Sequence, residues 1–284
     1  VDLRLTRTLA SLLTGAMLAV AGVLIQAVSR NPLADPYILG LSSTALAALS
    51  AAALVDVGFL VHRHLSISVS FLGAMSGYSM TTLLSLLAGG GSLSLILSGV
   101  AVTALFSGVS HVLLFMLQDR LKHPYVALLM GSTTYVVRSD IGYMVLALSA
   151  ILLVAVATGL PKALNAYLFG DWHAEQLGYR VRTVNALTAL LASLLTAVSV
   201  SLVGIVGFVG LAGPHISRML TGTSDHRLTI PVAALAGSSL TLLADVLSRL
   251  VSMVSPRGEM PLGVITSIIG APFLAYLVVR GGRR

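Results

Sequence analysis

The chain has 284 residues, of which 56% are hydrophobic and only 10% are charged. Soluble globular proteins carry about 25% charged residues, so this composition excludes a water-soluble enzyme, and the high apolar content excludes a disordered chain. The absence of cysteine removes disulfides, thiolate metal sites and cysteine nucleophiles. The net charge of +7 comes from cations spread singly over the joints between apolar stretches, which is typical of membrane proteins and not of nucleic-acid binding.

Apolar runs of the length needed to cross a bilayer, about 20 residues, recur along the whole chain. They cover residues 5–28, 37–55, 67–88, 93–117, 141–160, 184–206, 230–254 and 262–279. A further run, 208–220, is too short for an ordinary span, and we expect Gly210, Gly213 and Pro214 to break it. Nothing marks a domain boundary. The sequence therefore predicts one all-α domain over residues 1–284, a polytopic membrane helical bundle.

Two features suggest how this bundle is organised. Small residues at Gly15, Ala19 and Gly22 share a helix face, which lets helices approach closely in lipid. A weak internal repeat places residues 20–23 on 202–205, and Pro32 on Pro214, after a shift of 182 residues. Repeats with broken helices are common in transporters, although chance similarity between apolar stretches is the alternative explanation.

The sequence lacks the motifs of common catalytic and cofactor sites. Neither Lys122 nor Lys162 follows glycine, so there is no Walker A loop, and no His-Glu-x-x-His or Gly-x-Ser-x-Gly motif occurs. We therefore expect no catalytic residues, no metal site and no cofactor. Asp245 is the only acid well inside an apolar run, and it shares a helix face with Arg249. The two side chains either neutralise each other or meet a partner.

Several motifs follow one another in an order that matches a known family. They are residues 4–9, 31–36 with 39–40, 128–132 (without the family's usual tryptophan), 169–178, 207–211 with 214–216 and Arg218, 225–227, 243–245 with Arg249, and 261–263 with 270–273. Together they cover essentially the whole chain. This series resembles the FecCD-type permeases, which are membrane subunits of type II ABC importers for iron–siderophore chelates, haem and cobalamin.

The resemblance implies a fold and a set of partners. Family members have ten transmembrane helices, and this sequence starts where the second would, so we expect nine. The implied assembly is a homodimer in the cell membrane with two separate ATPase subunits and an extracytoplasmic binding protein. The implied cargo is an iron chelate, such as a siderophore or haem, or cobalamin, and it moves along the dimer axis. The chain itself is then a transport subunit and not an enzyme.

The resemblance also assigns roles to particular residues. The loop that contacts the ATPase contains Gly170, Asp171, Ala174, Glu175, Leu177 and Gly178. The outer rim that docks the binding protein contains Arg4, Arg7 and Arg249. The broken-helix signature contains Pro32, Pro36, Gly210, Pro214 and His215. Ser92, Leu93 and Ser94, where a glycine-rich turn meets the path helix, are candidates for the inner gate, although an ordinary turn would have the same sequence.

The charges of the joints do not fix the orientation of the chain in the membrane. In the orientation that the family implies, the inner and outer joints carry nearly equal numbers of cations, so the positive-inside rule does not decide the topology.

The alternative function is an ion-coupled secondary transporter or a channel that works without an ATPase. Such a protein would favour buried acids in the middle of its helices, and Asp245 lies near the end of its run.

Overall fold

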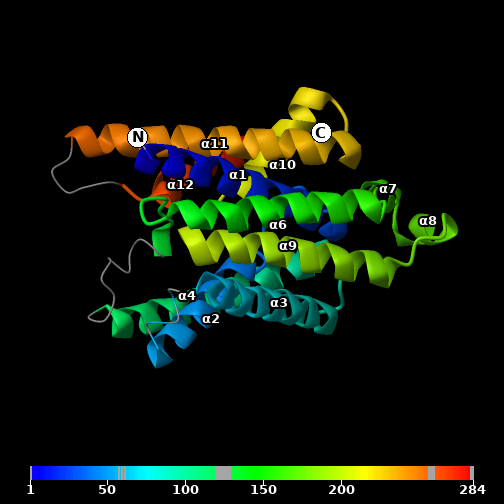
Figure 1. Cartoon of the computed structure of the whole chain (residues 1–284). Coiled ribbons are helices and arrows are strands. Elements are labelled where there is room, and N and C mark those ends of the chain that lie inside the picture. Colours follow the sequence, from blue (N-terminus) through cyan, green and yellow to red (C-terminus); the bar gives the residue numbers. More distant parts are fainter. Residues whose placement is uncertain are drawn as a thin grey trace.

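The computed structural model describes residues 2–56, 58, 60, 62–118, 129–254 and 260–281. Within this part the regular structure is helical, and no strand occurs. The helices are α1 (Asp2–Ser29), α2 (Leu41–Val55), α3 (Arg63–Leu87), α4 (Ser92–Leu117), α6 (Arg138–Ala157), α7 (Leu160–Tyr167), α8 (Asp171–Gln176), α9 (Val181–Val203), α10 (Val209–Thr221), α11 (His226–Val254) and α12 (Leu262–Gly281). The long helices run side by side, and α8 protrudes at one end of the bundle (Figure 1).

The expected all-α membrane bundle is confirmed. Each long apolar run of the sequence coincides with a helix, with ends that differ by a few residues. Helices long and apolar enough to cross a membrane are Leu3–Ser29, Arg63–Leu87, Ser92–Leu117, Arg138–Ala157, Val181–Val203 and His226–Met253. Shorter apolar helices cover Leu41–Val55 and the stretch Leu262–Ala275 of α12.

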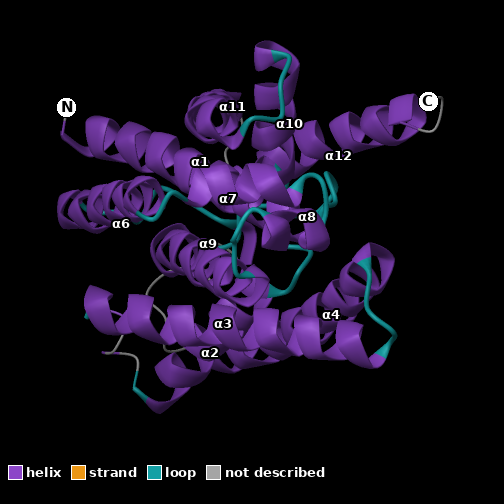
Figure 2. Cartoon of the chain, turned by 90° about the vertical axis from the view of Figure 1, so that its right-hand side faces the viewer, coloured by secondary structure: helices purple, strands orange, loops and turns teal. Residues whose placement is uncertain are grey.

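The helices form three groups when the bundle is seen from the α8 end (Figure 2). Helices α1, α10, α11 and α12 lie on one side, α6 and α9 in the middle, and α2, α3 and α4 on the other side. Most side chains of the spanning stretches of α1 and α9 are buried, whereas only 28% of those in α3, α4 and α6 are buried. The core therefore lies around α1 and α9, and the exposed apolar sides of the other helices face lipid or partner chains.

Small residues set the contacts of α1 with α10 and α11. A Cβ atom on Gly22 would lie 1.8 Å from the carbonyl oxygen of Gly210, so the two backbones touch there. Gly15 faces Gly237 of α11 in the same way. Hydroxyl groups add bonds between the same helices, since Thr241 donates to the Ser11 carbonyl at 2.7 Å. These contacts follow the rule that helices in lipid associate through close packing and polar bonds.

The break that we expected inside residues 208–220 lies elsewhere, and that prediction is wrong. Helix α10 is continuous, with Pro214 inside it. The chain breaks between α9 and α10, where Gly204 (φ 89) and Phe208 (φ 66) adopt positive φ values. Pro214 has no N–H to donate to the Gly210 carbonyl, so it interrupts one helical hydrogen bond without ending the helix.

The helices also do not follow the weak internal repeat. After a shift of 182 residues, the end of α9 at Val203 falls on Ala21, which lies well inside α1. Pro32 lies in the loop after α1, whereas Pro214 lies within a helix. The sequence similarity at this shift therefore pairs segments with different local structures.

Candidate coupling and docking sites

The polar joint before α9 folds into two short helices at one end of the bundle. Helix α7 is followed by a turn and by α8, and Gly170 (φ 106) and Gly178 (φ 85) flank α8 in conformations that favour glycine. Asp171 and Glu175 are exposed on α8, as expected for a partner surface. Ala174 differs from our expectation, because it is fully buried against its own chain and offers no surface to a partner.

Aromatic and apolar side chains around α8 are exposed instead. Phe169 is 75% exposed, Trp172 is 73% exposed and Leu177 is 58% exposed. An apolar cluster of this kind on a protruding polar segment is typical of a protein interface, where aromatic residues are enriched. Trp172 belongs to none of the assigned positions, although it is the chain's only tryptophan and lies between Asp171 and Ala174.

Side chains tie α7 to the turn before α11. Asn165 donates to the Asp225 carboxylate at 2.6 Å and accepts the backbone N–H of His226 at 2.8 Å. The Asn165 side chain, followed by the Arg227 backbone N–H, lowers the pKa of the Asp225 carboxyl below its usual value. This motif, which the resemblance placed in the signature, therefore anchors the α7–α8 segment to the bundle.

The segment also contacts the loop that follows α1. Arg30 forms an ion pair with Asp171, the first residue of α8. A polar cavity of about 250 Å³ opens beside this pair, and its walls include Arg30, Pro32 and Arg218. Arg218 lies on α10 and donates to the Gln26 side chain of α1 at 2.7 Å.

The candidate gate residues lie at the start of α4. Ser92 is its first residue, Leu93 is 71% exposed, and the Ser94 hydroxyl donates to the Ser85 carbonyl of α3 at 3.2 Å. Ser92 accepts a bond from Asn31 of the loop after α1. The turn is thus held from two sides, and its role as a gate stays a prediction.

The signature residues come together only in part. Pro36 and the buried Asp35 of the loop after α1 pack against Gly210 at the start of α10. Pro214 is buried in α10, and the ring of His215 meets Phe273 of α12 edge-on, with centroids 5.7 Å apart. Pro32 is exposed and lies apart from this group, at the cavity described above. Asp35 lies within the motif 31–36, but its burial against Gly210 depends on tertiary packing and has no local sequence signal.

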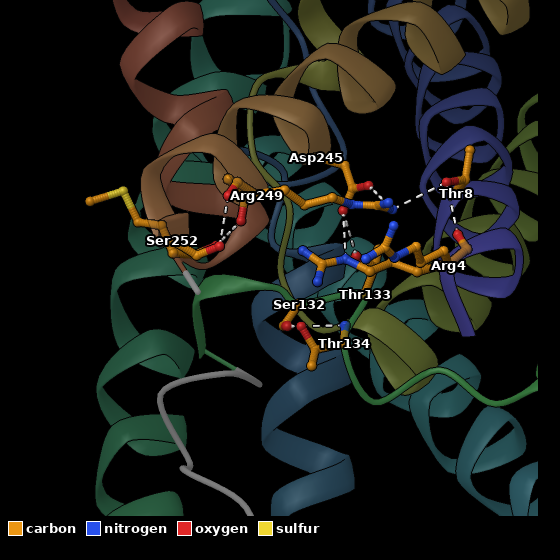
Figure 3. A network of polar contacts seen from close by, with 11 residues as sticks. Arg4, Thr8, Ser132, Thr133, Thr134, Asp245, Arg249 and Ser252 are labelled. Carbon is orange, nitrogen blue, oxygen red and sulfur yellow. Dashed lines mark hydrogen bonds and ion pairs between the residues drawn. The ribbon is translucent and has the colours of Figure 1, made fainter. Parts of the chain in front are cut away.

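The predicted docking rim lies at the start of α1, where Arg4 of α1 and Arg249 of α11 lie near Thr8 and Asp245 (Figure 3). Arg4 is exposed. Arg7 and Arg249 both bind the carboxylate of Asp245, which is 1% exposed, and the Arg7 Nε atom lies 2.9 Å from it. Thr133 donates to the same carboxylate at 3.0 Å.

This cluster joins α1, α11 and the segment before α6. Arg249 also donates to the Thr8 hydroxyl at 3.1 Å, and Thr8 donates to the Arg4 carbonyl at 2.9 Å. Both expectations for Asp245 are confirmed, because it pairs with Arg249 and also meets a partner, Arg7. Sequence spacing gave no sign of Arg7 or Thr133 as partners, because neither lies near Asp245 in the chain.

With this geometry in view, the comparisons with known proteins identify the chain. The model of the FecCD transport family matches residues 1–280. The chain belongs to this family. It is 36% identical over 285 residues to the hemin transport system permease HmuU of Yersinia pestis, covering 98% of this chain and 82% of HmuU. It is also 36% identical over 286 residues to the vitamin B12 import permease BtuC of Escherichia coli O139:H28, covering 99% of this chain and 84% of BtuC.

Solved structures agree with this membership. An ABC transporter assigned to the metal-chelate type, in an inward-facing conformation, superposes with a TM-score of 0.79 at 29% identity, covering 98% of this chain and 87% of its own. PsaBC from Streptococcus pneumoniae superposes with a TM-score of 0.68 at 15% identity, covering 97% of this chain and 91% of its own. At this low identity the similarity shows the shared fold alone. The FecCD chain is thus a membrane-embedded permease subunit of an ABC importer, and its ATPase activity resides in separate subunits.

Proposed function

We propose that two copies of this permease form a homodimer that binds two ATPase subunits at the α8 end and a substrate-binding protein at the Arg4 end. Each copy would cross the membrane with α1, α2, α3, α4, α6, α9, α10, α11 and α12. One observation carries this proposal: the two candidate partner surfaces lie at opposite ends of α1. Its 28 residues span about 42 Å, more than the roughly 30 Å of a bilayer core.

The exposed face of α4 supports the homodimer and its substrate path. A hollow of about 530 Å³ on this helix is lined by Ala104, Leu105, Gly108, Val109, Val112 and Leu113. Leu105 is 58% exposed and Val112 is 60% exposed in the single chain. Such a surface is weakly polar, and its small residues leave room for a bulky cargo. Two copies that face each other through α4 would enclose a wide path of low affinity, which suits passage without trapping.

We infer that the cargo is an iron chelate, such as a siderophore or haem, or cobalamin. The relatives are named for hemin and for vitamin B12, at the same 36% identity, and the structural neighbour is of the metal-chelate type. The discriminating experiment uses the binding protein that stimulates ATP hydrolysis by the complex. Its thermal unfolding is measured with haemin, cyanocobalamin and a ferric siderophore, and the cargo is the compound that raises its unfolding temperature most.

The alternative of an ion-coupled transporter finds less support. Asp245, the acid that this alternative would use, is neutralised by Arg7 and Arg249 at the outer end of the bundle. Native mass spectrometry after co-expression with a Walker-type ATPase tests the assembly, and we expect two copies of each subunit. Monomeric permease that takes up cargo along an ion gradient, without the ATPase, would overturn the proposal.

A further inference from the structure

We propose that Arg30 and Asn31 transmit the movement of α8 to the first turn of α4, and so act as positioning residues for the inner gate. This inference rests on the proposed coupling of α8 to an ATPase and goes beyond it by naming the link inside the permease. Arg30 contacts α8, and its neighbour Asn31 contacts α4. Because the two residues are adjacent, a displacement of one shifts the other.

The backbone of Arg30 shows why its side chain matters. Helix α1 ends at Ser29, and the N–H of Asn31 donates back to the Gln26 carbonyl at 3.3 Å, as in a Schellman ending. Arg30 then occupies the position where glycine is usual, with φ at 48°. An arginine is unfavourable in this left-handed conformation. Its presence there indicates that the side chain has a use that outweighs the strain.

The Arg30 side chain contacts both ends of the turn between α7 and α8. Its Nη2 atom donates to Oδ1 of Asp171, and its guanidinium carbon lies 5.9 Å from the centre of the Tyr167 ring. In the part of the chain that the structure describes, no other ion pair involves α8. The pair is about half exposed, so it adds little to stability, but it links α8 directly to the end of α1.

Asn31 extends the link to the gate turn. Its Nδ2 atom donates to the Ser92 hydroxyl at 2.8 Å, and its Oδ1 atom accepts the N–H of Leu33 at 2.8 Å, which fixes the orientation of the amide. Ser92 begins α4 directly after Gly89, Gly90 and Gly91, and all three glycines have positive φ. A glycine-rich turn of this kind can pivot when Ser92 is pulled.

The experiment uses the assembled complex with ATPase subunits in lipid nanodiscs. Because these 284 residues contain no cysteine, Leu93→Cys and, separately, Glu175→Cys each carry a single spin label. The change in the spectrum between the nucleotide-free and ATP–vanadate states is recorded. It is compared for wild-type, Arg30→Gly and Arg30→Asp backgrounds, and for Arg30→Asp combined with Asp171→Arg. Exposed Arg182, for which the structure gives no ion pair, supplies the matched control as Arg182→Ala.

We expect Arg30→Gly to fold well, because glycine suits the backbone, and to keep the nucleotide response at position 175. The response at position 93 should fall to less than half, and the charge-swapped pair should restore it. A full response at position 93 in Arg30→Gly would overturn the inference while leaving the proposed function intact. A wild-type complex without any response at position 175 would overturn the coupling assignment, and this inference with it.

Discussion

The buried carboxylate of Asp245 should be a main determinant of stability at the outer end. Replacing it with alanine leaves Arg7 and Arg249 partly buried without their counter-charge, and breaking such a buried group costs about 3–5 kcal/mol. We expect a loss of this size in the free energy of unfolding, measured by denaturant titration in detergent micelles. Exposed Asp56 is the control, and Asp56→Ala should cost less than about 1 kcal/mol. Equal losses in both variants would contradict this account.

Arg4 is the member of the predicted rim that is free to meet a binding protein, because it is exposed and makes no ion pair within the described residues. An exposed pair contributes about 0.2–1 kcal/mol, so Arg4→Ala should weaken binding no more than about fivefold. Arg4→Glu should weaken it further at low salt, since like charges then meet. The measurement is titration of binding protein onto permease in nanodiscs, with exposed Arg138→Glu as the control. Unchanged affinity in Arg4→Glu would refute the docking assignment of Arg4.

Individual contacts were predictable only where they are local. The spacing of Asp245 and Arg249 indicated their pairing, because residues four apart share a helix face. The pairing with Arg7 depends on how α1 crosses α11, which no local pattern encodes. Ala174 and Trp172 make the same point, because the resemblance marked the loop but could not say which side of α8 faces inward.

The contact between α1 and α10 should depend on the absence of a side chain at Gly22. A methyl group there would lie 1.8 Å from the Gly210 carbonyl oxygen, so the helices would have to separate. We expect Gly22→Ala to lower the free energy of unfolding by about 1–3 kcal/mol, as extra methyl groups in a well-packed core do. A Cβ added to Gly142 of α6 would meet no atom within 4 Å. Because alanine favours a helix more than glycine does, Gly142→Ala should raise the free energy of unfolding by up to about 1 kcal/mol. Thermal unfolding of both variants in detergent decides the point, and a neutral Gly22→Ala would disprove the close contact.

Helix positions were predicted well because apolar length dominates them. The run 93–117 corresponds to α4 (Ser92–Leu117), and 184–206 to α9 (Val181–Val203). The error at α10 arose because glycine and proline were taken as breakers wherever they occur. Gly210 and Pro214 instead lie in a short helix whose start packs against Pro36 and α1. Tertiary packing overrides local propensity there.

Clusters of polar side chains that link helices lie at the two ends of an apolar bundle. The Asp245 cluster holds α1, α11 and the segment before α6 together at one end. Arg30 joins α1 to α8 at the other. Helix α1 takes part in both and is mostly buried along its length. Helix α1 therefore connects the proposed docking face to the proposed ATPase face through one mostly buried element.

Trp172 offers a direct test of the ATPase-facing surface, because it is the only tryptophan in the chain and is 73% exposed on α8. Truncating an aromatic anchor at an interface typically costs 2 kcal/mol or more, which is roughly a 30-fold loss of affinity. We expect Trp172→Ala to lose ATPase binding by about this factor, with Trp172→Phe retaining most of it. Fluorotryptophan incorporated into the permease should give one ¹⁹F resonance, and ATPase addition should shift it. A tryptophan that only anchors α8 in the lipid headgroups would show the same resonance with and without the ATPase, and its alanine variant would bind the ATPase normally.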